Sequence, residues 1–177
     1  MAIITLRHER TADIPAREAL LDEAFGAVAR RRKTCEQLRE GRLPAEGLSL
    51  VASEGRRLIG TARLWPVACA PSVSALLLGP VAVTAACRNR GIGAALIARA
   101  LREARRLGHG AVMLVGDATY YGRFGFSSVK TQGLHLPGPF ERERLLALEL
   151  KPTTLDGARG LIRASGLADT GLHAAAA

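Results

Sequence analysis

The stretch CRNRGIGAALIARALREARRLGHG, residues 87–110, combines two closely spaced glycines, flanking arginines and a helical repeat. Apolar residues recur every three or four positions, which places them on one face of a helix from about Gly91 to Leu107. That face consists of Leu96, Ala100, Leu101, Ala104 and Leu107. Gly108 follows as a C-terminal cap. We therefore predict an amphipathic helix that packs its apolar face on a sheet.

The glycine turn that begins this helix is suited to bind a phosphate group. Gly91 and Gly93 let the backbone approach a ligand closely, and a helix N-terminus offers unpaired N–H groups at the positive end of its dipole. Arg88 and Arg90 add charge-assisted donors on either side of Asn89. We expect a phosphate-bearing ligand at this turn.

Two common nucleotide-binding motifs do not fit the turn. A P-loop requires Lys and then Ser or Thr after its last glycine, where this chain has Ala94 and Ala95. A dinucleotide fingerprint requires a small residue where Leu96 stands, and an acidic residue about 20 positions further on. Asp117 comes too late for that role. The turn alone therefore identifies no particular nucleotide.

The segments on either side of this helix alternate between strand and helix patterns. We predict strands over residues 3–10, 47–55, 56–67, 74–84, 111–116 and 144–150, and helices over residues 14–26, 30–43, 117–126 and 155–162. The strand over residues 74–84 should be interrupted at Gly79 and Pro80, because Pro cannot donate to a sheet ladder. The basic run from Arg30 to Lys33 is interpreted as a solvated surface rather than an anion site.

Composition restricts the class of protein. The chain has 177 residues, 48% of them hydrophobic, which fits one domain with a substantial core. No apolar run is long enough to span a bilayer, and the N-terminus does not have the pattern of a signal peptide. We therefore expect a cytoplasmic protein with no membrane partner. Three widely spaced cysteines indicate neither disulfides nor a metal site. The net charge of +9 favours anionic partners, but nucleic acid is not expected because the few aromatics (4%) are not interleaved with the arginines.

Two motifs in order resemble a known family. Residues 76–108, LLLGPVAVTAACRNRGIGAALIARALREARRLG, resemble the acyl-CoA signature of the GNAT N-acetyltransferase superfamily, and Arg88, Gly91 and Gly93 match its R-x-x-G-x-G/A turn. Residues 115–126, VGDATYYGRFGF, resemble the second motif of the family, with the family's spacing of Tyr121 from Gly125 and Phe126. The resemblance covers about residues 3–150 and is closest to the subgroup with a VGDxxYYxRFGF motif, mostly uncharacterised bacterial proteins.

The resemblance implies a fold and a cosubstrate. The fold would be α+β, with a mixed, mostly antiparallel central sheet that contains a splayed parallel strand pair and is flanked by helices. Residues 1–152 would form the N-acetyltransferase domain and residues 153–177 a C-terminal appendage. Acetyl-CoA would be the cosubstrate, with its pantetheine arm on the backbone of the interrupted strand and its pyrophosphate at the glycine turn. The implied cofactor-binding residues are Val81, Ala82, Val83, Arg88, Asn89, Arg90, Gly91, Ile92, Gly93, Ala94, Tyr120 and Phe124.

The resemblance also implies roles in catalysis. Tyr121 would face the departing sulfur, and because a phenol with a pKa of about 10 is a weaker acid than a thiol of about 8.5, it should act mainly as a hydrogen-bond donor. The alternative is that Tyr120 and Tyr121 are packing aromatics. Asp117 stands where many members carry an Asn that contacts pantetheine, and it is a catalytic candidate on the amine side. The general base is left open between Asp117, Glu23 and Glu141, while two histidines, His109 and His135, are more typical of structural or solvated groups.

The function implied is transfer of the acetyl group from acetyl-CoA to a primary amine, by direct attack in a ternary complex. A backbone N–H near the strand bulge would polarise the thioester carbonyl. The acceptor, a small molecule or a protein amine, would enter between the first two helices and residues 131–140, with Trp65 and Phe140 as possible lining. The alternative is a non-catalytic acyl-CoA sensor or partner-binding module. The acceptor, the acyl-chain preference and a possible homodimer are left open by the sequence.

Overall fold

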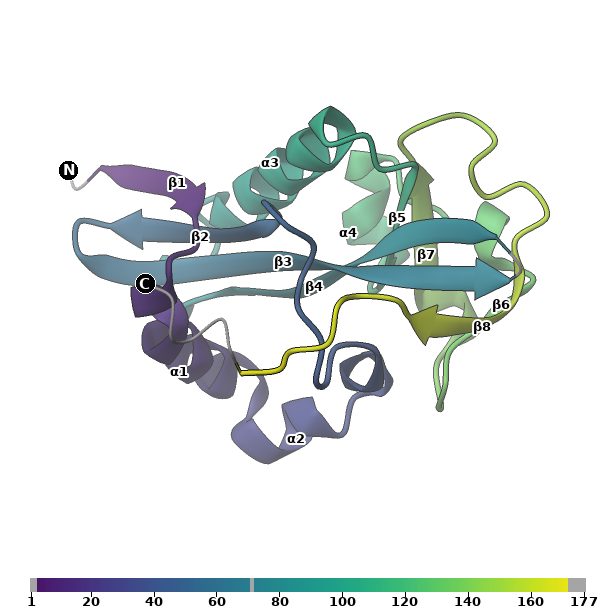
Figure 1. The fold of residues 1–177 in the computed structure, drawn as a ribbon. Helices are drawn as coiled ribbons and strands as arrows, with labels where there is room; N and C mark the ends of the chain where they lie inside the picture. The colour runs from purple at the N-terminus through teal and green to yellow at the C-terminus, as the bar shows by residue number, and fades with distance from the viewer. Residues whose placement is uncertain (1–2, 71, 172–177) are drawn as a thin grey trace.

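The computed structural model describes residues 3–70 and 72–171, which form a mixed sheet with helices on both of its faces (Figure 1). Its strands are β1 (Ile4–His8), β2 (Ser49–Glu54), β3 (Arg57–Ala70), β4 (Val73–Val83), β5 (Ala111–Val115), β6 (Leu134–His135), β7 (Leu145–Glu149) and β8 (Arg159–Ala164). Its α-helices are α1 (Ile14–Phe25), α2 (Ala27–Arg31), α3 (Ile92–Arg106) and α4 (Ala118–Tyr121). Short 3-10 helices connect them: η1 (Thr11–Asp13), η2 (Thr34–Leu38), η3 (Ala85–Cys87), η4 (Gly122–Phe124), η5 (Val129–Thr131) and η6 (Arg142–Arg144).

The sheet contains the splayed parallel pair that the resemblance implies. Along the order β1-β2-β3-β4-β5-β7, neighbouring strands are antiparallel except for β4 and β5. These two pair in parallel only where Leu76 meets Val112 and Leu77 meets Met113. Beyond these positions β4 continues to Val83 without β5 as a partner. The predicted fold class is confirmed, and the β4 edge that faces β5 is left open there.

A bulge replaces the interruption predicted in β4. Ala62 of β3 lies opposite Val81, and Leu64 lies opposite Leu78, so that Arg63 alone faces both Gly79 and Pro80. The extra residue on β4 is where Pro80 lacks a donor for the ladder. The strand thus remains one element, bent at the position predicted to break it.

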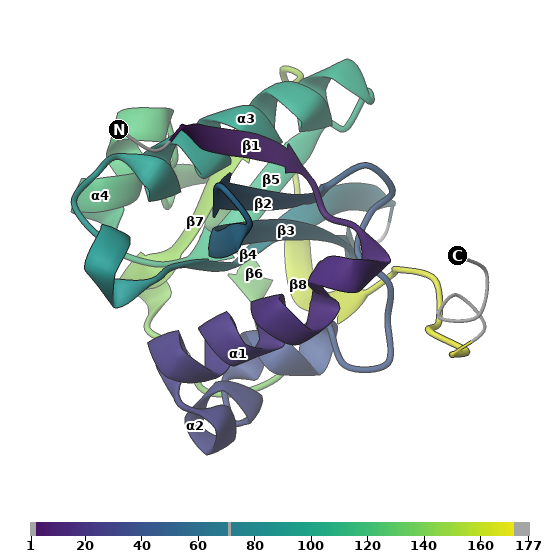
Figure 2. The same cartoon turned by 90° about the vertical axis from the view of Figure 1, so that its left-hand side faces the viewer.

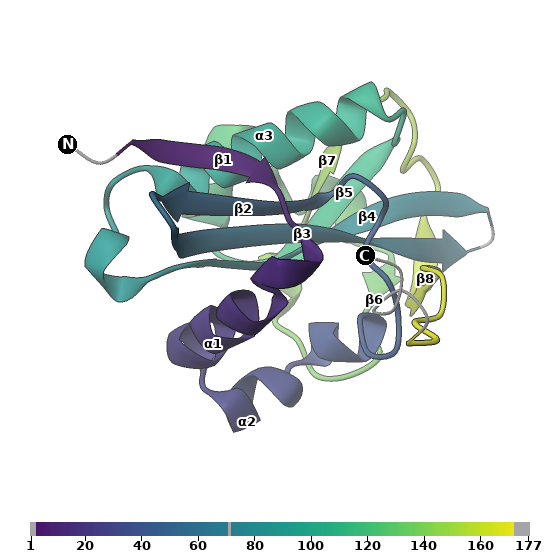
Figure 3. The same cartoon turned by 60° about the vertical axis from the view of Figure 1, so that its left-hand side comes forward.

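The two faces of the sheet are covered by different elements. Helix α3 buries Leu96, Ala100 and Ala104 against one face, as its amphipathic pattern predicts. Helix α1 packs on the opposite face, where Leu20 and Leu21 contact Ala82 of β4. Figures 2 and 3 show α3 on one side of the sheet and α1 and α2 on the other.

Two predicted helices are wrong in part or whole. The helix predicted over residues 30–43 is replaced by α2 and the 3-10 helix η2, which are joined by an extended residue, Lys33. The helix predicted over residues 155–162 does not form, and strand β8 occupies much of that segment. Its apolar residues Leu155, Ala158 and Ile162 have helical spacing, but each is buried against the sheet core instead.

The C-terminal segment packs against the rest of the fold. β8 pairs with β3 beyond the end of β2 and also with the two-residue strand β6. After β8, the Leu43 amide donates to the Leu167 carbonyl (2.8 Å) and the Arg42 guanidinium donates to the Gly166 carbonyl (3.0 Å). A domain boundary after residue 152 stays a prediction, but the chain beyond that residue contributes a strand to the sheet and supports the residues that follow η2.

Candidate active site

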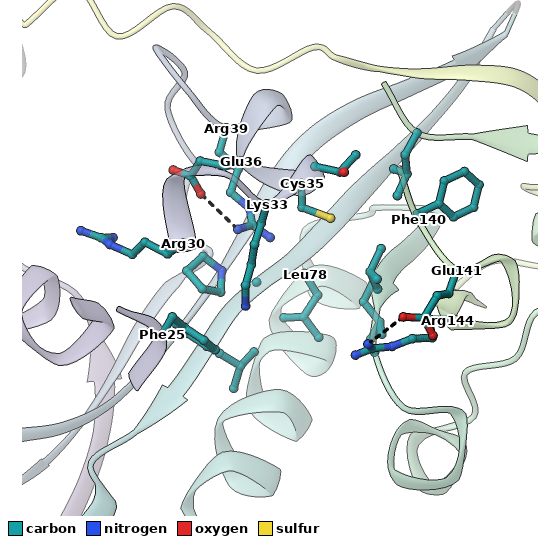
Figure 4. A pocket seen from close by; sticks show the side chains of 18 of the residues that line it. Phe25, Arg30, Lys33, Cys35, Glu36, Arg39, Leu78, Phe140, Glu141 and Arg144 are labelled. Atoms are coloured by element: carbon teal, nitrogen blue, oxygen red, sulfur yellow. Dashed lines mark hydrogen bonds and ion pairs between the residues drawn. The ribbon is translucent and has the colours of Figure 1, made fainter. Parts of the chain in front are cut away.

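Two cavities meet beside the bulged part of β4. The smaller, about 270 Å³, is a groove between the end of α1, β4 and the start of α3, and we call it the β4 groove. It is lined by Ala24, Phe25, Val81, Ala82, Val83, Arg88, Gly93, Ile97, Tyr120 and Tyr121. The larger, about 620 Å³, lies between the α2–η2 segment and residues 136–144, and we call it the basic cavity (Figure 4).

The start of α3 presents unpaired donors to the β4 groove. Gly91 has a left-handed backbone (φ 74°) and precedes the helix, and no side chain caps it. The Ala95 amide donates to the Gly91 carbonyl (2.9 Å), so the amides before it lie ahead of the first helical hydrogen bond. Such amides, at the positive end of a helix dipole, are an anion-binding arrangement.

The two arginines of the turn have different surroundings. The Arg90 guanidinium donates to Glu54 (2.9 Å) and to the Cys87 sulfur (3.4 Å), which ties it to β2. The exposed Arg88 lines the β4 groove, and its side chain forms no hydrogen bond or ion pair within the described residues. Arg88 is therefore the cation available to a phosphate.

The structure has room for a side chain at Gly93. A Cβ built at Gly93 would meet the Val83 Cγ2 at 3.7 Å and the Tyr120 hydroxyl at 3.8 Å, which are ordinary contacts. Its backbone is not in the left-handed region. Neither packing nor conformation therefore requires glycine at this position. The residues here fit a ligand that approaches the backbone, as a CoA pyrophosphate would.

The other predicted cofactor residues lie around the groove rather than in its wall. Asn89 is exposed and has a positive φ of 61°, so it shapes the turn. The Ile92 side chain is buried in the core, which leaves only its backbone for a ligand. Ala94 belongs to the first turn of α3. Phe124 packs against the rings of Tyr120 and Tyr121, with centroids 5.9 and 6.4 Å away. Their contacts with a cofactor stay predictions.

Tyr121 lies where the two cavities meet. Its ring is packed edge-on against Tyr120 and Phe126, with centroids 5.0 and 6.0 Å away. A Cβ on Gly116 would lie 2.4 Å from the ring, so the glycine at the end of β5 makes room for it. Burial raises the pKa of Tyr121, and its hydroxyl has no hydrogen-bond partner among the described residues. Tyr121 is thus a neutral donor next to both cavities.

The junction of the cavities is formed by few residues. Phe25, Val81 and Tyr121 line both the β4 groove and the basic cavity. They come from three elements, the end of α1, the open part of β4 and the end of α4. A group held in one cavity can therefore reach a group held in the other at this point.

The basic cavity has an excess of cations in its wall. Its charged lining residues are Arg30, Arg32, Lys33, Arg39, Arg63 and Arg144 against Glu36, Asp117 and Glu141. Figure 4 shows Arg30, Lys33 and Arg39 on one side of the cavity and Arg144 on the other. Arg31, Arg32 and Lys33 are exposed, as the interpretation of residues 30–33 as a solvated surface predicts, although Arg32 and Lys33 also line the cavity. That interpretation is wrong for Arg30, which is half-buried and paired with Glu18 and Asp22. Periodicity could not show that α2 and η2 turn these side chains toward a cavity.

Two of these cations, the buried Arg63 and the half-buried Arg39, belong to the part of the cavity next to the bulge. Arg63 is only 8% exposed, and burial lowers the pKa of its guanidinium to about 10. Burial also lowers the pKa of the Arg39 guanidinium, whose terminal nitrogen lies 3.0 Å from where a Cβ on Gly79 would stand. The Nε atoms of both arginines are buried without a hydrogen-bond partner in the described structure. Neither residue is predicted from the sequence, because a single Arg in a strand or next to a short helix carries no motif.

Of the general-base candidates, two line the basic cavity. Asp117 caps α4, where its carboxylate accepts from the Thr119 amide (2.9 Å). Glu141 pairs loosely with Arg144 (3.6 Å). Glu23 is exposed on α1 and lines neither cavity, and neither do His109 and His135. Glu36 lines the cavity as well, paired with Arg39 at 3.5 Å, and the sequence analysis did not consider it.

The segments predicted to form the acceptor entrance line this cavity, but entry of an acceptor there stays a prediction. Phe140 and Leu136 line it, and the Thr34 hydroxyl donates to the Pro139 carbonyl (2.6 Å), which joins η2 to the loop. Trp65 does not line the cavity. Its indole N–H donates to the Gly79 carbonyl (2.7 Å) in the buried core.

The cysteines are single free thiols. Burial raises the pKa of Cys35, which lines the basic cavity, and raises that of Cys69 to about 11. A protonated thiol is a poor nucleophile.

Within the described residues, no group of three or more His, Cys, Asp or Glu is arranged to hold a metal ion. None of the described helices combines the length and apolarity needed to span a bilayer.

Comparison with known proteins identifies the family. The sequence family described as Acetyltransferase (GNAT) domain matches residues 5–129, more than half of the chain. The chain therefore belongs to the GNAT acetyltransferase family and is an enzyme of the acyltransferase class.

Similar proteins cover nearly all of the chain. The uncharacterized N-acetyltransferase YhbS of Escherichia coli strain K12 is 28% identical over 158 residues, which are 89% of this chain and 93% of YhbS. The crystal structure of E. coli YhbS in complex with CoA has a TM-score of 0.78 at 27% identity, and covers 93% of this chain and 91% of its own. A GNAT family acetyltransferase from Brucella melitensis in complex with acetyl-CoA has a TM-score of 0.68 at 28% identity, with coverage of 93% and 97%.

Proposed function

We propose that this enzyme transfers the acetyl group of acetyl-CoA to a primary amine, by direct attack of the amine within a ternary complex. The observation that carries the proposal is the junction at Phe25, Val81 and Tyr121, which line both cavities. An acyl donor in the β4 groove and an amine in the basic cavity would meet there. Holding both reactants in one site makes the attack effectively unimolecular.

The β4 groove suits acetyl-CoA. Arg88 and the unpaired amides at the start of α3 would bind the pyrophosphate, and Gly93 leaves it room. The open edge of β4 from Val81 to Val83 would bind the amides of the pantetheine arm in the manner of an added strand. Similar GNAT proteins crystallised with CoA and with acetyl-CoA support the same cosubstrate here.

The residues at the junction would divide the chemistry between them. Tyr121, kept neutral by its raised pKa, would donate a hydrogen bond to the departing thiolate sulfur. Asp117 or Glu141 would take the proton from the attacking ammonium, directly or through water. A backbone N–H near the bulge would polarise the thioester carbonyl. Because Cys35 is held as a thiol, attack through a covalent enzyme intermediate is not expected.

Steady-state kinetics test the proposal. We expect release of free CoA thiol from acetyl-CoA when a suitable primary amine is added, with intersecting double-reciprocal lines when both substrates are varied. Parallel lines would indicate a covalent intermediate and contradict direct attack. If acetyl-CoA binds but no amine in a broad panel causes thiol release, the non-catalytic sensor becomes the better hypothesis.

A further inference from the structure

The basic cavity contains a charge arrangement that the acetyl transfer itself does not require. Arg63 lies on β3 opposite the bulge at Gly79 and Pro80, and Arg39, the residue after η2, has its guanidinium next to Gly79. Both line the basic cavity. Burial is the main reason that the pKa of Arg63 is lowered, and the charges of Arg17 and, more weakly, Arg39 add to it. A buried cation such as Arg63, with further cations near it, destabilises a fold unless an anion compensates its charge.

The described residues do not supply that anion to Arg63. Its side chain makes no ion pair or hydrogen bond within the described structure, and its guanidinium carbon lies over the Trp65 ring, 4.9 Å from the centroid. The acids that act on Arg63 from nearby, Glu9 and Glu18, make their ion pairs with other arginines: Glu9 with Arg17, and Glu18 with both Arg17 and Arg30. Glu9 uses one oxygen for this, and its buried Oε2 has no hydrogen-bond partner among the described residues, so it attracts Arg63 without bonding to it. Arg63 is more than nine-tenths buried, lines the cavity and has no partner there.

Arg39 is only partly compensated. Its single acidic partner, Glu36, lies at 3.5 Å, the outer limit of a hydrogen bond, and its Nε–H is buried without a partner in the described residues. The adjacent Lys33 ammonium lies over the Phe25 ring, 4.2 Å from its centroid, and has no ion pair with a described residue. The cavity wall next to the reaction junction is therefore electropositive.

We propose that the acceptor is a small amine that also carries a carboxylate or phosphate group, and that Arg63 and Arg39 bind this anionic group. This inference rests on the proposed acetyl transfer. The bulge at Gly79 lies two residues along β4 from the junction residue Val81, which corresponds to roughly 7 Å at the rise of a strand. An acceptor whose amine and anion are separated by a few bonds would span that distance. The cavity volume of about 620 Å³ accommodates such a molecule.

Matched acceptors test the inference. The acidic 4-aminobutyrate is compared with its neutral amide, 4-aminobutanamide, and 3-aminopropyl phosphate with 3-aminopropanol. We expect kcat/KM to be at least tenfold higher for the acidic member of one or both pairs, because a charge-assisted bidentate contact contributes that much. The pair with the larger ratio identifies the anion. Equal or higher kcat/KM for both neutral members would overturn the inference.

A variant separates a binding role of Arg63 from a structural one. Arg63→Met keeps the apolar stem and removes the charge, so we expect the acidic preference to fall toward one while the Tm stays the same or rises. Arg105→Gln, which removes one charge from the exposed face of α3, is the matched control and should change neither quantity. A lowered Tm with an unchanged preference would show that Arg63 only supports the fold.

A binding measurement keeps the inference testable if no amine is acetylated. The full-length protein is saturated with CoA, to fill the phosphate site, and titrated by calorimetry with glutarate or with its neutral isostere glutaramide. We expect glutarate to bind at least tenfold more tightly, and Arg63→Met and Arg39→Gln to remove the difference. Equal affinities would overturn the anion site. Absence of thiol release from every amine would instead contradict the proposed function.

Discussion

Gly91 and Gly93 stand two residues apart, but glycine suits them for different physical reasons. Gly91 has a left-handed backbone, which a side chain would strain. Gly93 has neither a left-handed backbone nor a close neighbour, and a Cβ there would make only ordinary contacts. Glycine at position 93 therefore leaves space for a ligand, which we infer to be the pyrophosphate of CoA.

Replacing Gly93 with alanine should separate stability from cofactor binding. Alanine in a helix is favoured over glycine by about 0.5–1 kcal/mol, so Gly93→Ala should unfold at the same or slightly higher denaturant concentration. Its methyl group would occupy the space of the pyrophosphate, and the Kd for CoA measured by calorimetry should rise at least tenfold. Gly122→Ala, with nothing within 4 Å of its new methyl, is the control. Wild-type CoA affinity in Gly93→Ala would contradict the assignment.

Tyr121→Phe removes one hydroxyl and leaves the packed ring in place. If the hydroxyl donates to the departing thiolate, kcat should fall roughly tenfold to a hundredfold, the value of a hydrogen bond to a charged group. CoA affinity and Tm should be unchanged. Since burial raises the pKa of Tyr121, the donor should remain protonated at and above the ordinary phenol pKa. An unchanged kcat would return Tyr121 to a packing role.

At the scale of single residues, more of the residues that line the β4 groove than of those that line the basic cavity could be predicted from the sequence. Arg88, Gly91 and Gly93 form a local motif whose spacing is legible along the chain. Arg63 and Arg39 meet at one place only because the bulge puts Arg63 opposite Gly79, while the Arg39 guanidinium lies next to the same glycine. That meeting is a tertiary contact between distant segments, and no pattern in either segment predicts it.

Among the elements, the β1 and α1 segments are joined by two ion pairs, Arg17 with Glu9 and Arg7 with Asp13. The Arg7 guanidinium donates to both Asp13 oxygens (2.6 and 2.8 Å), and the Arg10 amide donates to the same carboxylate (2.7 Å). These contacts, chiefly the Arg7 hydrogen bonds, lower the pKa of Asp13 to about 2. Asp13 thus fixes the turn from the edge strand into the helix that carries Phe25.

The Asp13 contact predicts a pH dependence of stability. A carboxyl group with a lowered folded-state pKa stabilises the fold above its ordinary pKa of about 3.9, and this contribution is lost as the pH falls through about 2. Asp13→Asn should therefore be less stable than wild type at pH 7, and the difference should shrink between pH 4 and pH 2. Denaturant unfolding at several pH values measures it. A difference that is constant over that range would contradict the assignment.

The elements that the sequence predicted well are those with long, unambiguous periodicity. Helix α3 and the strand β5 match their predicted segments because an amphipathic helix and a short buried strand have distinct patterns. Residues 155–162 failed because three apolar positions fit a helix as well as a turn followed by a strand. The deciding factor was the unpaired edge of β3 beyond β2, which is visible only in the assembled sheet.

For the whole molecule, strand β8 determines how far the cooperative fold extends. Ile162 is 1% exposed in the core, whereas its neighbour Leu161 is 40% exposed. Ile162→Ala should cost about 2–4 kcal/mol of unfolding free energy, and Leu161→Ala should cost less than about 1 kcal/mol. Chemical denaturation monitored by fluorescence of Trp65 compares them. Equal and small losses would mean that residues beyond 152 are an appendage after all.

The pairing of β8 with β3 also has a consequence for the order in which the chain assembles. Val67 pairs with Ala164, and the residues that follow β8 bind Arg42 and Leu43, three and four residues after Arg39. Closing such a long loop is slow compared with forming α3 next to β4 and β5. During synthesis we therefore expect the nascent chain to form the β4 groove before residue 164 has emerged from the ribosome, and to complete the wall of the basic cavity only afterwards. An incomplete chain would then be able to bind acetyl-CoA before its acceptor site has formed.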